Sequence, residues 1–142
     1  MQEALIDTSL YVAAARRGHD GAQLLDQSAS GDDLWLSAVV LEELYAGADE
    51  RSRKWVEQLE AEYEREQRIL VPNQEDWIET GRVLSRLALR YGYERIGRGR
   101  LTNDALIAVS AGRAGIRVMT ANATDFRRLA EFRSFEWELV AG

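Results

Sequence analysis

Short apolar runs alternate with longer segments of mixed polarity along the whole chain. The runs are typical of buried strands, which we predict at residues 4–6, 34–36, 69–71, 116–119 and 135–140. Apolar residues spaced by three and four predict helices between them, at residues 9–16, 22–28, 37–47, 49–67, 73–92, 104–113 and 124–131. Strands that alternate with helices favour a parallel sheet covered on both faces, so the predicted fold class is α/β.

Turn and cap formers lie between these segments. Ser37 and Thr102 are suitable N-caps for the helices that follow them, and Gly115 is a suitable helix terminator. Pro72, the only proline, closes the third strand. Residues 93–101 hold two glycines and three arginines and are expected to form a loop. The tryptophans are expected in the core or in an interface: Trp35, Trp55, Trp77 and Trp137.

Length and composition favour a single globular domain over residues 1–142. Hydrophobic residues make up 46% of the chain and charged residues 30%, which is typical of a folded protein rather than a disordered one. No apolar run approaches the roughly 18 residues that span a bilayer, and the N-terminus lacks the pattern of a signal peptide. The absence of cysteine excludes disulfides and thiolate zinc sites. We therefore expect a cytoplasmic protein without a membrane partner.

The charge is unevenly distributed. A net charge of -6 argues against a general nucleic-acid coat protein. Between residues 90 and 128, however, eight arginines stand against three acidic residues, and Lys54 is the only lysine in the chain. Arginine suits bidentate contacts to phosphate. A solvated surface without a ligand is the alternative interpretation.

Four acidic residues stand beside apolar segments. Asp7 follows the first predicted strand, and Glu43 lies on the helix after the second. Asp104 begins the helix that leads to the fourth strand, and Asp125 follows that strand. Sites in open parallel sheets form beyond the carboxyl ends of strands, where the strand order reverses. If the first and fourth strands are neighbours, the four carboxylates can therefore converge.

Each residue also has an ordinary structural explanation. Asp7 could cap a helix, Asp104 and Asp125 could complement a helix dipole, and Glu43 could be solvated. All four explanations would have to hold together for the pattern to be accidental.

Convergent carboxylates indicate a hard divalent cation, Mg²⁺ or Mn²⁺, and metal-assisted hydrolysis of a phosphodiester. A carboxylate that does not bind the cation can take a proton from the attacking water. Without the cation, four anions in one cleft repel one another, so we expect at least one carboxyl group to bind a proton.

The motifs carry a family resemblance. They occur in the order seen in PIN-domain ribonucleases, and they span Leu5–Ser9, Val40–Gly47, Asn103–Ala108 and Thr120–Phe126. Over nearly its whole length the chain is most similar to the VapC-like toxins of bacterial type II toxin–antitoxin systems. The resemblance implies a three-layer α/β/α fold with a five-stranded parallel sheet in the order 3-2-1-4-5. It also implies an Mg²⁺- or Mn²⁺-dependent endoribonuclease, an RNA substrate, a cognate antitoxin and a homodimer.

The resemblance also implies the site residues. The acidic catalytic and metal-binding positions are Asp7, Glu43, Asp104 and Asp125. The supporting polar residues are Thr8, Thr120 and Asn122. Many relatives carry arginine where this chain has Ala121, and Arg127 could replace it. The other possible RNA contacts are Arg95, Arg98 and Arg100.

Two alternatives remain open. A phosphoaspartate receiver domain also uses an acidic pocket at strand ends, but it needs a lysine near a late strand, and Lys54 lies within a predicted helix. A PIN fold that only binds partners is the other alternative, and Ala121 leaves room for it.

Overall fold

A five-stranded sheet forms the centre of the protein. The structure is a computed structural model that describes residues 2–18, 33–93 and 99–140. The strands are β1 (Glu3–Ile6), β2 (Asp33–Ser37), β3 (Ile69–Leu70), β4 (Arg117–Thr120) and β5 (Trp137–Leu139). They lie in the order β3-β2-β1-β4-β5, and each neighbouring pair is parallel. The predicted sheet and strand order are therefore confirmed.

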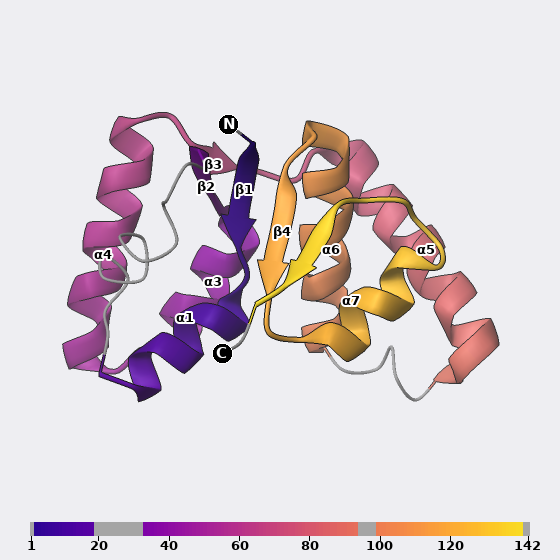
Figure 1. The fold of residues 1–142 in the computed structure, drawn as a ribbon, viewed down its shortest axis with the longest axis horizontal. Helices are drawn as coiled ribbons and strands as arrows, with labels where there is room; N and C mark the ends of the chain where they lie inside the picture. Colours follow the sequence, from indigo (N-terminus) through magenta and orange to yellow (C-terminus); the bar gives the residue numbers. More distant parts are fainter. Residues whose placement is uncertain (1, 19–32, 94–98, 141–142) are drawn as a thin grey trace.

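Helices lie on both sides of this sheet. They are α1 (Thr8–Arg16), α3 (Ala38–Ala46), α4 (Glu50–Arg65), α5 (Gln74–Tyr91), α6 (Gly99–Ala114) and α7 (Ala123–Ala130). In Figure 1, α1, α3 and α4 form one group and α5, α6 and α7 form the other, with the strands between them. None of the helices in the described ranges combines the length and the apolar character needed to cross a bilayer.

Side-chain caps fix where several helices begin. Ser37 accepts a hydrogen bond from the Val39 amide at 3.1 Å and starts α3, as its sequence position predicts. The N-caps of α4 and α5 are Asp49 and Asn73, and each forms a reciprocal capping box with the residue three positions on. These bonds satisfy amides that have no partner within the helix.

Helix α6 begins earlier than the sequence pattern predicts. Thr102 was the predicted cap of a helix starting at Asp104, but α6 starts at Gly99, so Thr102 lies inside it. Leu101 is buried and continues the apolar face of Ala105 and Ala108, and this burial outweighs the helix-breaking tendency of the nearby glycines. Asp104 is therefore beyond the first helical turn, where a dipole role is weakest.

The core lies on the inner strands. Leu5, Leu36 and Val118 have no exposed surface, and Ile107 and Phe126 belong to the same apolar cluster. Burial of each such side chain stabilises the folded state by about 1.5–3 kcal/mol, because its apolar surface leaves water. Trp77 differs from the other tryptophans because it is 57% exposed, so it is not a core residue in this chain.

An ion pair between a buried aspartate of α5 and a partly exposed arginine of α6 joins the two helices. Asp76 is 2% exposed and accepts two hydrogen bonds from Arg113 Nε, both at 2.9 Å. The Asp76 carboxylate also accepts a hydrogen bond from the Asn73 amide, so its buried charge is both paired and hydrogen-bonded. Through α6, this contact helps to set the position of Asp104.

Three sequence predictions differ in extent from the structure or cannot be compared with it. Strand β3 ends at Leu70, and Val71 is exposed. The predicted helix at 22–28 and most of the predicted loop at 93–101 lie outside the described residues.

Candidate functional site

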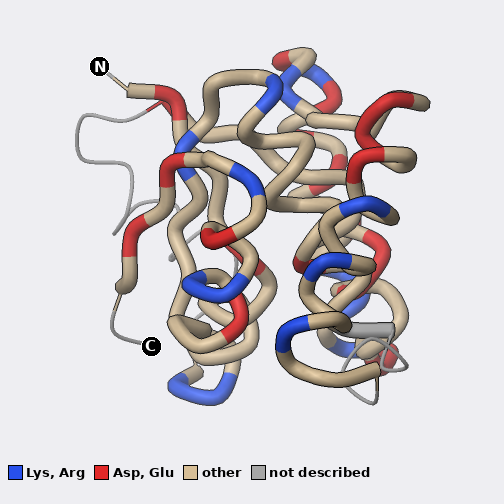
Figure 2. The backbone as a smooth tube through the Cα atoms, turned by 90° about the vertical axis from the view of Figure 1, so that its right-hand side faces the viewer, with Lys and Arg blue, Asp and Glu red and all other residues tan. Residues whose placement is uncertain are grey.

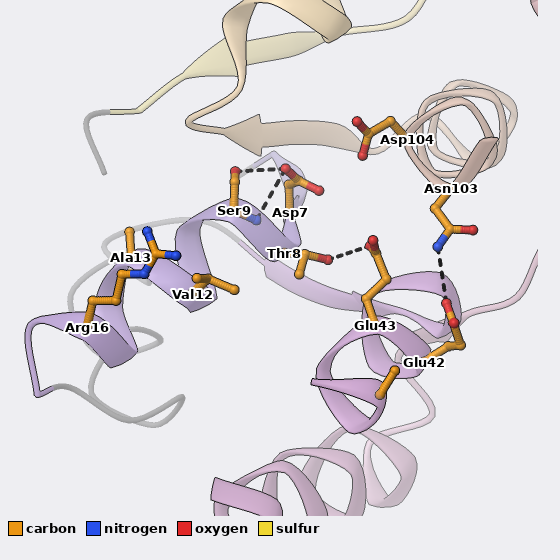
Figure 3. A pocket seen from close by; sticks show the side chains of 11 residues that line it. Asp7, Thr8, Ser9, Val12, Ala13, Arg16, Glu42, Glu43, Asn103 and Asp104 are labelled. Atoms are coloured by element: carbon orange, nitrogen blue, oxygen red, sulfur yellow. Dashed lines mark hydrogen bonds between the residues drawn. The ribbon is translucent and has the colours of Figure 1, made fainter. Parts of the chain in front are cut away.

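A cleft of about 570 Å³ opens at the carboxyl end of β1. Helices α1, α3 and α6 contribute its walls, and three of the four predicted carboxylates line it: Asp7, Glu43 and Asp104. Figure 3 shows these three side chains around one space, with Glu42 and Asn103 at its edge. The segments that carry them are distant in sequence and meet because β1 lies between β2 and β4.

Asp7 is the most constrained of these residues. It is 2% exposed, and its amide donates to the Met119 carbonyl of β4 at 2.9 Å. Its Oδ2 accepts from the hydroxyls of Ser9 and Thr120, each at 2.8 Å, and is the N-cap acceptor of α1. Its Oδ1 is buried and has no hydrogen-bond partner among the described residues. A buried carboxylate oxygen without a partner is costly unless a ligand meets it.

Glu43 is half-buried on α3 and faces Asp7 across the cleft. Its Oε1 accepts from the Thr8 hydroxyl at 2.7 Å, which fixes the direction of the carboxylate. Burial raises the pKa of Glu43, and hydrogen bonds from Thr8 and Asn103 oppose the rise. The charges of Asp7 and Glu42 add to the rise. The direction agrees with the expected proton uptake by a carboxyl group in this cleft.

Asp104 and Asp125 are linked by one amide. Asp104 is 3% exposed, and Asn122 Nδ2 lies 3.4 Å from its Oδ2. The same Nδ2 donates to Asp125 Oδ2 at 3.0 Å. Asn122 is also the N-cap of α7. Asp125 does not line the cleft, and the Asn122 amide connects it to Asp104, which does.

Ser9 is a site residue that the sequence interpretation missed. Its hydroxyl bonds Asp7, lies 3.3 Å from the Thr120 hydroxyl, and accepts from the Ala121 amide at 3.0 Å. It therefore connects the ends of β1 and β4. The signal in the sequence was its place two residues after an aspartate, where a serine can share the cap of a helix.

The predicted RNA contacts are only partly described. Arg127 is exposed on α7. Arg95 and Arg98 lie outside the described residues, and nothing is described of the side chain of Arg100. Lys54 is exposed on α4 and does not line the cleft, so the receiver-domain alternative lacks its lysine.

Four carboxylates line the cleft, those of Asp7, Glu42, Glu43 and Asp104, and oxygen ligands of this kind suit a hard cation. Among the described residues, no three acidic or histidine side chains stand close enough together to hold a metal ion in their present rotamers. Hydrogen bonds from Thr8 and Asn122 hold Glu43 and Asp104 in these orientations. The partnerless Oδ1 of Asp7 nevertheless fits a divalent cation, because it is fixed, buried and anionic.

Residues 4–132 match the family model described as the PIN domain. The chain belongs to the PIN domain family. Comparison with curated protein sequences gives no significant match.

Solved structures with the same PIN fold include three crystal structures of VapBC proteins. DNA-bound VapBC from Salmonella typhimurium has a TM-score of 0.67 at 21% identity, over 97% of this chain and 98% of that one. VapBC-1 from nontypeable Haemophilus influenzae has a TM-score of 0.62 at 21% identity, with the same coverage. VapBC2 from Rickettsia felis, bound to a promoter DNA fragment, has a TM-score of 0.65 at 20% identity, over 98% and 99%. At these identities the likeness is one of fold.

Replacing Glu43 by glutamine should stabilise the metal-free PIN domain at neutral pH. Because folding raises the pKa of Glu43, the folded state loses stability as pH rises from the ordinary glutamate pKa through the raised value. Glutamine carries no charge and can still accept from Thr8. Thermal unfolding with a chelator present should therefore give Glu43→Gln a higher midpoint than the wild type at pH 7.

The two midpoints should converge at a pH below the ordinary glutamate value, where Glu43 is protonated in both states. Glu64→Gln is the matched control, because Glu64 is exposed on α4 and does not line the cleft. An equal or lower midpoint for Glu43→Gln at pH 7 would show that burial of Glu43 carries no such penalty.

Proposed function

We propose that this PIN domain is an endoribonuclease that hydrolyses RNA phosphodiester bonds with Mg²⁺ or Mn²⁺. The observation that supports the proposal most is Asp7, a buried carboxylate with one oxygen locked by two hydroxyls and the other without a partner. Glu43 and Asp104 line the same cleft. Acids arranged in this way attract a cation rather than a phosphate, so the cation is what makes the cleft suitable for a phosphodiester.

Asp7 and Asp104 would hold the divalent ion. When bound, that ion supplies positive charge to the phosphodiester, whose negative charge grows during hydrolysis. Thr120 and Ser9 keep the Asp7 carboxylate oriented, and this lowers the reorganisation needed when substrate binds.

Glu43 is the carboxylate best suited to act as the general base. Its raised pKa brings its basicity closer to neutral pH, and Thr8 directs its Oε1. The water proton would pass to Glu43 as the water oxygen bonds phosphorus. The bond between phosphorus and the leaving ribose oxygen would break, and that oxygen would take a proton from solvent. Asn122 and Asp125 keep Asp104 in place.

Asp7→Asn should abolish most RNA cleavage without unfolding the chain. Asparagine can still cap α1 and accept from Ser9 and Thr120, but it lacks the charge. Several kcal/mol of transition-state stabilisation depend on the ion, and about 1.4 kcal/mol is tenfold in rate, so we expect a loss of at least about 100-fold. The measurement is cleavage of transfer and ribosomal RNA with Mg²⁺ or Mn²⁺.

The control is Asp49→Asn, which changes an exposed helix cap outside the cleft. Equal cleavage by Asp7→Asn and the wild type would refute the assignment. A wild-type chain that binds no divalent ion in calorimetry and cleaves no RNA would instead support a PIN fold that only binds partners.

We also propose an antitoxin partner that docks beside the acidic cleft. A second, mainly apolar cleft of about 300 Å³ lies between α1, α3 and α4, and it shares Val12, Arg16 and Glu43 with the first. Tyr11 and Trp55, which stack at 6.3 Å, contribute its aromatic part. An apolar segment of a partner seated here would block the approach of RNA. The VapBC neighbours make a toxin–antitoxin pair the natural candidate.

Ala15→Arg tests this docking site. Ala15 is exposed and lines only the apolar cleft, so an arginine there should obstruct an apolar segment while RNA cleavage continues. The partner to test is the small protein encoded by the neighbouring reading frame. Co-expression should suppress cleavage by the wild type and fail to suppress cleavage by Ala15→Arg. Suppression of both to the same degree would place the partner elsewhere.

Finally, we propose that the chain pairs with a second copy through α5. Trp77, Gly81, Ser85 and Leu89 follow a four-residue spacing on one exposed face of α5. Leu89 is 74% exposed, and Ile78, which follows Trp77 in sequence, is 41% exposed. Small residues between large apolar ones let two helices approach closely.

Leu89→Arg should lower the mass seen in light scattering from that of two chains to that of one. Leu139→Arg, which changes an exposed leucine on β5, is the matched control and should leave the mass unchanged. A wild-type chain that is monomeric at high concentration would contradict the proposal.

A further inference from the structure

Arginine is concentrated on two segments that neighbour each other in space. Residues 82–93, on α5 and just after it, and residues 123–133, on α7 and just after it, together hold six arginines and two acidic residues. The whole chain has a net charge of -6, so this concentration runs against its overall balance. Figure 2 looks at the side of the molecule that lies on the right in Figure 1 and shows basic segments along its helices. We call the line where the two segments meet the arginine seam.

Side-chain contacts join the two segments directly. Arg86 Nη1 donates to the Phe132 carbonyl at 3.5 Å, and Arg90 pairs with Glu131 at 3.5 Å. The Tyr91 hydroxyl donates to the same Glu131 at 2.5 Å. The seam is therefore a built surface, in which one glutamate serves two partners from α5.

Two positive groups share one aromatic ring in this seam. The guanidinium carbons of Arg90 and Arg128 lie 5.5 Å and 4.5 Å from the centre of the Tyr91 ring. The negative face of the ring attracts both groups, although their charges repel each other. Arg127 is exposed, and no acidic side chain of the described residues pairs with it. The arginines of α5 are paired, because Arg82 and Arg86 contact Glu75 and Glu79 and Arg90 contacts Glu131. The excess positive charge of the seam therefore lies on α7.

The seam begins at the acidic cleft. Asn122 caps α7 and contacts both Asp104 and Asp125, so the first turn of α7 lies at the cleft edge. Arg127 and Arg128 follow within the next turn. An RNA strand with one phosphodiester bound in the cleft would pass over these arginines.

We propose that single-stranded RNA lies along the arginine seam beside the cleft, with its phosphates on Arg127, Arg128 and Arg90 and a base against Tyr93. This inference rests on the proposed nuclease function. Tyr93 is 68% exposed at the end of α5, and exposed aromatic rings among arginines are the combination that holds single-stranded nucleic acid. An acidic protein segment would use the charge but would have no need of an exposed ring or of continuity with the cleft.

The test measures RNA binding separately from cleavage. In an Asp7→Asn background without divalent ions, the affinity for a single-stranded oligouridylate is measured by fluorescence anisotropy over a series of salt concentrations. Each lost phosphate contact lowers the slope of log affinity against log salt by about 0.7 for a single strand. Arg127→Gln should therefore weaken binding and reduce the slope by about that amount. Tyr93→Ser should weaken binding and leave the slope unchanged.

Arg53→Gln is the matched control, because Arg53 is exposed on α4, at the opposite side of the molecule in Figure 1. Both seam variants change exposed side chains, so circular dichroism should give the wild-type fold. If Arg127→Gln and Tyr93→Ser bind RNA as Arg53→Gln does, the seam proposal is overturned, even if the wild type cleaves RNA.

Two other outcomes separate the proposals. A chain with Asp7 intact that cleaves no RNA would reject the nuclease function, whatever the seam variants do. The wild type could also bind oligoglutamate more tightly than RNA and lose that binding in Arg127→Gln. This result would overturn the RNA assignment in favour of an acidic protein partner.

Discussion

The site depends on one junction, where the end of β1 meets the end of β4. The Asp7 amide bonds the Met119 carbonyl there, and the Thr120 hydroxyl bonds the Asp7 carboxylate. Ser9 bridges both strands, because it bonds Asp7 and accepts from the Ala121 amide. These bonds hold a buried carboxylate at a fixed point of the sheet and offset part of the free-energy cost of removing it from water. Thr8, Glu43 and Asn122 form a site only through their positions relative to the Asp7 carboxylate.

The polar network around this junction is a compromise between stability and chemistry. It satisfies one oxygen of Asp7 and leaves the other without a partner among the described residues. It also directs Glu43 through Thr8 while burial raises the pKa of that carboxyl group. Apolar or fully paired groups would be more stable at this position, and a partly unsatisfied polar arrangement is typical of functional sites. The tight Asp76–Arg113 pair at another part of α6 shows how the same fold treats a buried charge with a purely structural role.

The sequence predicted the fold well because its signals are local and repeated. The positions of helices and strands and the Ser37 cap follow from apolar periodicity and cap chemistry, which neighbouring residues largely determine. The strand order followed from the resemblance to PIN-domain ribonucleases. The start of α6 was wrong because Leu101 gains more from tertiary burial than the glycine-rich pattern around it suggests. Ser9 was missed because its partner Thr120 is more than a hundred residues away. Asp125 was expected in the cleft, but its link through Asn122 depends on side-chain geometry that spacing does not encode.

Strand order also determines when during synthesis the cleft can form. Asp7 is made near the beginning of the chain, whereas Thr120 and Asn122, 113 and 115 residues later, come from its last quarter. A nascent chain that has not yet released β4 from the ribosome has α1 and α3 but cannot lock the Asp7 carboxylate. The polar network around Asp7 can therefore be completed only after β4 and the first turn of α7 have been synthesised.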